Sequence, residues 1–172
     1  MKETLAFTRK LDKLTLLYPR LPKMAGVVAV NFFKNRFRTQ DWIDNTSHPW
    51  EGRKRKSSTK RGILVNSGRL KRSIRITRST YNSIWIGTDV PYAQIHNEGG
   101  RVKGTARVSA HNRKAFTRRR KGRKETVQAH AVKAHARKVN FIMPRRQFMG
   151  TSAVLDKKIE RTLTAEIMRA LK

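Results

Sequence analysis

Ionisable side chains that could act as acids, bases or metal ligands are few in this sequence. Asp89, His96 and Glu98 lie within a ten-residue stretch and could form an acid–base or metal site. A hydrolase that uses these three groups is one hypothesis. The alternative is structural, with Asp89 capping a short helix and Glu98 pairing with a nearby cation. Because the chain has eleven carboxylates in 172 residues, we favour the structural alternative and predict no enzyme activity.

Three histidines stand further along the chain, at His111, His130 and His135. Nitrogen ligands alone can hold a metal, but no carboxylate accompanies these three. The absence of cysteine excludes disulfides and thiolate sites. The glycines near position 100 do not form a phosphate-cradling loop, since no Lys-Ser or Lys-Thr pair follows them at the required spacing. We therefore predict no catalytic residues, no metal and no cofactor.

Charge is the extreme feature of the composition. Forty-one Lys and Arg face eleven Asp and Glu, for a net charge of +30. A compact fold with this imbalance repels itself and needs an anionic partner, which could be nucleic acid, an acidic protein surface or anionic lipid. Lys and Arg neutralise phosphates without sequence preference. The predicted nucleic-acid or partner contacts are the cations of two blocks: Arg53, Lys54, Arg55 and Lys56, and Arg118, Arg119, Arg120, Lys121, Arg123 and Lys124.

Apolar residues at spacings of three and four predict three helices. The first covers residues 2–18 and ends at Pro19. The second begins at Pro22, whose missing N–H costs nothing at a helix start, and runs to about Arg38. The third starts near Ser152. The stripes expected to pack in the core are Leu5, Leu11, Leu14, Leu17 and Tyr18; Met24, Val27, Val28, Phe32 and Phe37; and Leu155, Ile159, Leu163, Ile167 and Leu171.

The middle of the chain predicts short elements joined by loops. Residues 39–62, with Trp42 and Trp50, have the character of a basic loop. Asn66 or Ser67 can cap a helical turn that runs to about residue 73. Alternating apolar residues at 74–77 and 84–86 predict an antiparallel hairpin. Residues 91–97 form a short helix that the glycines at 99 and 100 stop.

Residues 101–142 contain an internal repeat. The segment 108–114 matches 132–138 at five of seven positions. A two-stranded ribbon folded at Gly122 would place the two copies on opposing strands. Residues 101–146 hold sixteen Lys and Arg against one acid, Glu125. Because an isolated ribbon is marginal in water, we expect a neighbouring molecule to order it, through strand pairing or an anionic surface.

These elements predict an α+β fold. A small antiparallel sheet is packed by N-terminal and C-terminal helices and carries a long basic β-hairpin arm. We expect a single domain over residues 1–172, with 101–142 as the arm and 39–62 as the basic loop. The longest apolar run, Met24–Val30, is far shorter than the roughly 20 residues of a membrane span. The N-terminus lacks the apolar region of a secretory signal, so we expect the protein in the cytoplasm at synthesis.

Three segments taken in order, 64–74, 86–100 and 143–150, resemble motifs of the phage virion morphogenesis family, the Mu G-like tail-completion and neck proteins. The chain departs from the family pattern at Asn66-Ser67, and Gln147 replaces a proline. The resemblance covers about residues 20–172. The matching motif positions are Gly68, Leu70, Ser73, Gly87, Tyr92, His96, Gly99, Pro144, Arg146, Phe148 and Gly150.

The resemblance implies a structural subunit that forms a homo-oligomeric ring, a hexamer, at the head–tail junction. Such a ring, in a neck or a tail-terminator position, would join the tail to the head around the DNA channel. Its implied partners are portal or connector and tail-tube proteins and double-stranded DNA, with no membrane. The implied location is the virion, after assembly in the host cytoplasm. A free nucleic-acid-binding protein of ribosomal or chromatin type is the alternative.

The motif residues are expected to build the fold. We expect Tyr92, Ile95 and Phe148 to pack where the hairpin, the short helix and the final helix meet.

Overall fold

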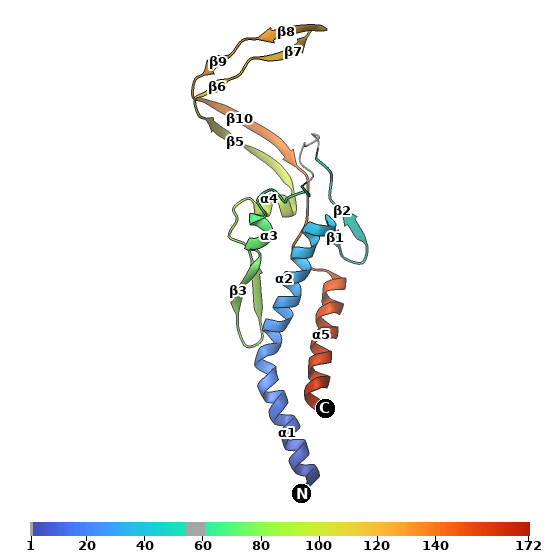
Figure 1. Cartoon of the computed structure of the whole chain (residues 1–172). Helices are drawn as coiled ribbons and strands as arrows, with labels where there is room; N and C mark the ends of the chain where they lie inside the picture. Colours follow the sequence, from blue (N-terminus) through green and yellow to red (C-terminus); the bar gives the residue numbers. More distant parts are fainter. Residues whose placement is uncertain (1, 54–60) are drawn as a thin grey trace. The chain divides into compact units, whose positions relative to one another are not determined.

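The computed structural model describes residues 2–53 and 61–172, and these form two compact units. The first unit, here called the body, contains the described residues of Met1–Gly99 together with Pro144–Lys172. The second unit, here called the arm, is Gly100–Met143. Figure 1 shows helices and short hairpins in the body and a two-stranded ribbon in the arm. This content confirms the predicted α+β class with terminal helices.

The three long helices of the body are those that the apolar spacing predicts: α1 (Lys2–Leu17), α2 (Leu21–Thr39) and α5 (Ala153–Leu171). A short 3-10 helix, η1 (Tyr18–Arg20), joins α1 to α2 at Pro19. Helix α2 ends at Gln40, whose left-handed backbone (φ 58°) lets its N–H bond the Arg36 carbonyl at 2.7 Å. Ser152 caps α5, because its hydroxyl accepts the Leu155 N–H at 3.2 Å.

Packing of these helices differs from the prediction on two faces. Phe32 and Phe37 of α2 are buried, but Val27 is 49% exposed. On α1, which packs against α5, Leu11 is 46% exposed, and Tyr18, the first residue of η1, is 52% exposed. The expected core stripe of α1 is therefore partly a surface stripe, because α5 covers one side of the helix. The stripe of α5 is buried or half-buried throughout, as predicted.

Two hairpins accompany the helices, rather than one small sheet. Strands β3 (Arg75–Ser79) and β4 (Ile84–Gly87) pair antiparallel, with a bulge between Ile76 and Arg78, and confirm the predicted hairpin. Strands β1 (Asp41–Ile43) and β2 (Ser47–Pro49) form the other. The prediction of a loop over 39–62 is therefore wrong for residues 41–49, since three-residue strands carry too little periodicity to be recognised.

Two short helices complete the body. Helix α3 (Arg69–Ser73) has Gly68 at its N-cap and no side-chain cap, so the predicted capping by Asn66 or Ser67 is wrong. Ser67 Oγ, one residue earlier, accepts the Arg69 N–H at 3.4 Å. Helix α4 (Ala93–Glu98) ends at Gly99, as predicted. Its first turn has no side-chain cap, so Asp89 does not play the predicted role. Asp89 instead lies 3.8 Å from Arg75 in an exposed ion pair.

The core of the body is an aromatic cluster. Phe37 of α2 lies 5.1 Å from Phe148 and 5.6 Å from Trp50, between ring centroids. Trp42 stacks on Phe33 at 6.3 Å. Trp42 and Trp50, at 6% and 7% exposure, are core residues and not the loop markers that the sequence indicates. Offset and edge-on aromatic contacts of this kind add to the free energy of burial.

Candidate functional site

The arm is an antiparallel ladder of six strands in three pairs. These pairs are β5 (Gly100–Val108) with β10 (His135–Met143), β6 (His111–Arg113) with β9 (His130–Val132), and β7 (Phe116–Arg120) with β8 (Arg123–Val127). The chain reverses at Lys121-Gly122, both with positive φ (48° and 79°). This turn matches the twist of paired strands and confirms the fold predicted at Gly122.

Two breaks interrupt the ladder without shifting its register. Residues 109–110 face 133–134 at the first break, and 114–115 face 128–129 at the second, so each strand loses the same number of pairs. The arm changes direction at the first break (Figure 1). Equal interruptions on both strands bend the ribbon while every later pair stays opposite its partner.

The repeat accounts for the breaks. Val108 pairs with His135 and His111 with Val132, so the two copies lie on opposing strands, as predicted. The same pattern, valine, any residue, alanine, histidine, occurs again at 127–130, and a variant, Arg-Lys-Ala-Phe, occurs at 113–116. Each unpaired dipeptide is the middle of one copy. The sequence prediction missed the last two copies because they repeat after five residues, which is not a period of regular secondary structure.

Each histidine of the repeat bonds the chain just before it. The Nδ1 atom of His111 lies 3.0 Å from the Ser109 carbonyl oxygen, and His130 and His135 make the same contact at 2.9 Å with the carbonyls of Gln128 and Lys133. A carbonyl accepts, so Nδ1 donates in each contact. The ring thus satisfies a backbone group that the break removes from the ladder.

The histidines do not gather around a common point. His111 lies opposite Val132, His135 opposite Val108 and His130 opposite Arg113. Within residues 2–53 and 61–172, no cluster of three or more His, Cys, Asp or Glu is arranged to hold a metal ion. Asp89, His96 and Glu98, all of them described, therefore form no such cluster either. Glu98 accepts a hydrogen bond from Gln94 at 3.2 Å, where the sequence suggested a cation.

Cations dominate the tip of the arm, here defined as β7, β8 and their turn. Arg118 faces Glu125 and forms an ion pair with it at 2.9 Å. The hydrogen bond from Arg118 to this carboxylate, and its charge, raise the pKa of Arg118. The next two cross-strand pairs are cation against cation, Arg119 with Lys124 and Arg120 with Arg123. Like charges directly opposite each other destabilise a strand pair.

The arm exposes nearly everything that it carries. No residue of Gly100–Met143, all of which the structure describes, is buried. At the base of the tip Phe116 faces Val127, both half-buried, and the Arg113 guanidinium lies 4.5 Å from the Phe116 ring centre. This pair is the apolar anchor of the tip. The predicted contacts Arg118 to Lys124 are thus brought together on one exposed hairpin.

Of the other predicted basic block, the structure describes Arg53, which lies in the body. Arg53 donates to the carbonyls of Arg61 and Gly62 at 2.9 and 2.7 Å. Its guanidinium therefore makes backbone contacts in addition to carrying charge. Lys54, Arg55 and Lys56 lie outside the described residues.

The motif residues of the body meet one another, which the sequence could suggest only through the family pattern. Ser73 and Thr88 join the first two motifs through a hydroxyl pair at 2.5 Å. The Asn97 side chain accepts the N–H groups of Phe148 and Met149 at 2.9 and 3.0 Å, which joins the second motif to the third. Leu70 and Phe148 are buried and Ile95 is half-buried, but Tyr92 is 42% exposed. The expected packing role of Tyr92 is therefore wrong.

Arg146 fastens the segment that returns from the arm. Its side chain donates to the carbonyls of Glu51 and Gly52 at 3.0 and 3.2 Å, and its backbone N–H donates to the His96 carbonyl at 2.8 Å. Burial is the main cause that lowers the pKa of Arg146. His96 is half-buried, and its Nδ1 has no partner among the described residues. Burial, followed by the nearby Arg146 charge, lowers the pKa of His96.

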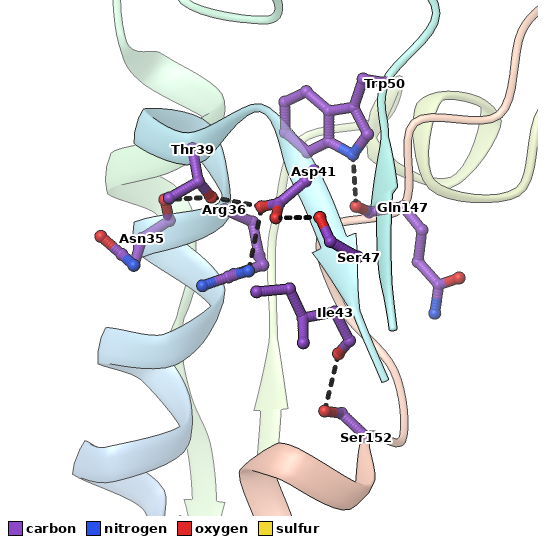
Figure 2. A network of polar contacts seen from close by, with 9 residues as sticks. All are labelled: Asn35, Arg36, Thr39, Asp41, Ile43, Ser47, Trp50, Gln147 and Ser152. Atoms are coloured by element: carbon purple, nitrogen blue, oxygen red, sulfur yellow. Dashed lines mark hydrogen bonds and ion pairs between the residues drawn. The ribbon is translucent and has the colours of Figure 1, made fainter. Parts of the chain in front are cut away.

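A polar network that the sequence did not reveal holds β1 and β2 to the helices (Figure 2). The Asp41 carboxylate accepts from Arg36 at 2.9 Å, from Ser47 at 2.8 Å and from the Thr39 hydroxyl. Ser152 donates to the Ile43 carbonyl at 2.7 Å. These contacts fix β1 and β2 against both α2 and the start of α5.

Together these features define a structural subunit with a fastened body and an exposed cationic arm. The family model of the phage virion morphogenesis family matches residues 3–168. The chain therefore belongs to the phage virion morphogenesis family, which serves structure and assembly in phage virions. Neither the curated proteins nor the solved structures yielded a match. No helix in the described part of the chain is long and apolar enough to cross a membrane.

Proposed function

We propose that this chain is a neck, tail-completion or tail-terminator subunit that forms a homo-oligomeric ring, a hexamer, and joins the tail to the head around the DNA channel. The body builds the ring. The arm contacts the neighbouring components, which are other subunits, portal or connector and tail-tube proteins, or the DNA. The finished protein then resides in the neck or tail of the virion.

One observation carries the proposal: a 44-residue segment, Gly100–Met143, forms a ladder without a buried residue. A two-stranded ribbon gains too little free energy from its own packing to be stable at this length by itself. Its exposed surface and strand edges are suited to other molecules. In a family that builds virions, those molecules are the components next to the subunit.

An exposed apolar stripe on α1 of the body favours the proposed ring. Phe7 and Leu11 are 61% and 46% exposed and lie one turn apart on the same face. Exposed apolar side chains on one helix face are suited to contact with another apolar surface. A head-to-tail contact between such a stripe and another surface of the next copy closes into a ring when the rotation allows it.

The register of the arm allows a clean test. Lys103 and Asn140 are cross-strand partners, so residues 104–139 can be replaced by an Asn-Gly turn that closes the shortened hairpin. We expect this variant to fold and to form rings, but to fail to join tails to heads in a complementation assay. A second variant, in which Asn-Gly replaces 117–126 between the partners Phe116 and Val127, separates the tip from the rest of the arm.

The measurements are native mass, negative-stain imaging and the yield of joined particles. Rings of the deletion variant with no joined particles support the proposal. Infectious particles at the normal yield from the 104–139 variant would contradict it. A soluble monomer that binds nucleic acid tightly, forms no rings and is absent from virions would favour the free nucleic-acid-binding alternative, which the density of cations in the arm also suits.

A further inference from the structure

The cations of the tip point to both faces of the ribbon. Successive strand residues alternate between faces, and cross-strand partners share one. Arg120 and Arg123 therefore lie on one face, beside the Arg118–Glu125 ion pair, and Arg119 and Lys124 lie on the other. A ligand that neutralises the tip must present negative charge to both faces.

The tip is also incomplete by itself. Two of its three outermost cross-strand pairs, Arg119 with Lys124 and Arg120 with Arg123, place like charges opposite each other. The arm contains one acid, Glu125, and it is already paired with Arg118. The repulsion within the hairpin is relieved only when anions from outside the arm approach.

A duplex groove meets these requirements better than a protein surface. The major groove of B-DNA admits a two-stranded β-ribbon and has phosphates along both walls. A sheet with its side chains is about 10 Å thick from face to face, so a hairpin that stands edge-on fits the roughly 12 Å groove with each face toward one wall. An acidic patch on a protein is a single surface and would neutralise one face of the tip.

We propose that the tip of the arm binds duplex DNA by lying in its major groove, with the cations of both faces on phosphates of the two walls and without reading the base sequence. The anchor pair Phe116 and Val127 holds the base of the inserted hairpin. This inference deepens the proposed function by naming the partner of the arm, and it rests on that function only for its place in the virion.

The test compares two pairs of substitutions in the full-length protein. Arg120→Gln/Arg123→Gln removes the cations of one face, and Arg119→Gln/Lys124→Gln removes those of the other. Both retain the Arg118–Glu125 ion pair. The matched control, Lys157→Gln/Lys158→Gln, removes two exposed cations of α5, so all three variants have the same net charge. The probe is a fluorescent 30-base-pair DNA duplex. Its binding is measured by fluorescence anisotropy at NaCl concentrations from low to physiological.

Groove binding predicts that both face variants weaken duplex binding to a similar degree, by roughly tenfold at physiological salt. Each should also reduce the salt dependence of log K by about two, because each loses two phosphate contacts. The control should bind within about twofold of the unchanged protein, as its cations are outside the arm. Removing like charges from the hairpin does not cost it stability, so loss of binding is not loss of folding.

Three outcomes would overturn the inference. One is a loss confined to a single face variant, which indicates a flat partner. Another is an equal loss of binding in the control, which indicates that net charge alone, and not a site on the tip, determines the affinity. The last is competition by polyglutamate that is as strong as competition by unlabelled duplex at equal charge, which indicates that the partner is an acidic protein. Head–tail joining by the same variants is scored separately, so failed DNA binding with normal rings and joining leaves the proposed function standing.

Discussion

Arg36 and Asp41 form an ion pair at 2.9 Å in which both side chains are nearly excluded from water, at 5% and 11% exposure. The pair spans the end of α2 and the start of β1. The Arg36 guanidinium also lies 4.6 Å from the centre of the Phe32 ring. The pair therefore connects the aromatic core to the β1–β2 hairpin.

Replacing Asp41 by alanine should destabilise the body by about 3–5 kcal/mol, because the change leaves the Arg36 charge buried without its partner. The free energy of unfolding in urea measures this. The double variant Arg36→Met/Asp41→Ala serves as the control and should recover part of the loss, since no charge remains buried. A double variant at least as unstable as Asp41→Ala would contradict this account.

Gly99→Ala should also destabilise the body. The backbone of Gly99 (φ 73°, ψ −169°) lies in a region that only glycine adopts freely. A Cβ there would stand 2.8 Å from the Arg145 backbone nitrogen, which cannot move aside as a side chain could. We expect a loss of about 1–3 kcal/mol from the backbone conformation and a further loss from the contact, seen as a lower Tm.

Gly104→Ala is the matched control for Gly99→Ala. A Cβ at Gly104 meets nothing within 4 Å, and its φ is not positive. The Tm of this variant should stay within about 2 °C of the unchanged protein. Equal losses of Tm in the two variants would show that the positive φ of Gly99 and its contact with Arg145 are not the cause.

Stability should rise with pH across the range in which His96 titrates. Burial and Arg146 lower the pKa of His96 in the folded state, so the unfolded chain binds its proton more readily. Stability is then fully present above the unfolded pKa of about 6.5 and falls as the pH drops toward the folded pKa. His96→Gln should flatten this part of the profile.

Urea denaturation between pH 5 and pH 8 measures this dependence. The two proteins are first compared at pH 8, where His96 is neutral, so that any loss of packing is separated from titration. A variant that keeps the full slope between pH 5 and pH 7 would show that other groups cause it.

Local patterns in the sequence predicted the elements whose information is local. Helix α5 follows from apolar residues four apart, and the reversal at Gly122 follows from a glycine between two copies of one repeat. The tip cations were found because a run of Lys and Arg cannot be buried and must be exposed.

The missed features depend on residues far apart in the chain. Trp50 is buried in the core, and its indole N–H donates to the Gln147 carbonyl at 2.8 Å, across 97 residues of sequence. Asp41 has no motif around it, and its role appears only when β1 folds against Arg36. Tyr92 matched a family pattern, yet it is an exposed ring packed edge-on to His96 at 5.9 Å between ring centres. A motif gives a position without stating which side of a helix faces the core.

The exposed stripe of α1 predicts how a ring would respond to substitution. Phe7→Ser/Leu11→Ser removes two apolar side chains that the body leaves 61% and 46% exposed. Because they are already largely in water, the unfolding free energy of the subunit should change by less than about 1 kcal/mol. If these side chains form the contact between copies, the native mass of the purified protein should shift toward the monomer.

Val154→Ser, at 39% exposure near the start of α5, is the control and should leave the assembly intact. Rings that persist at unchanged concentration dependence in Phe7→Ser/Leu11→Ser would place the subunit contact elsewhere on the body.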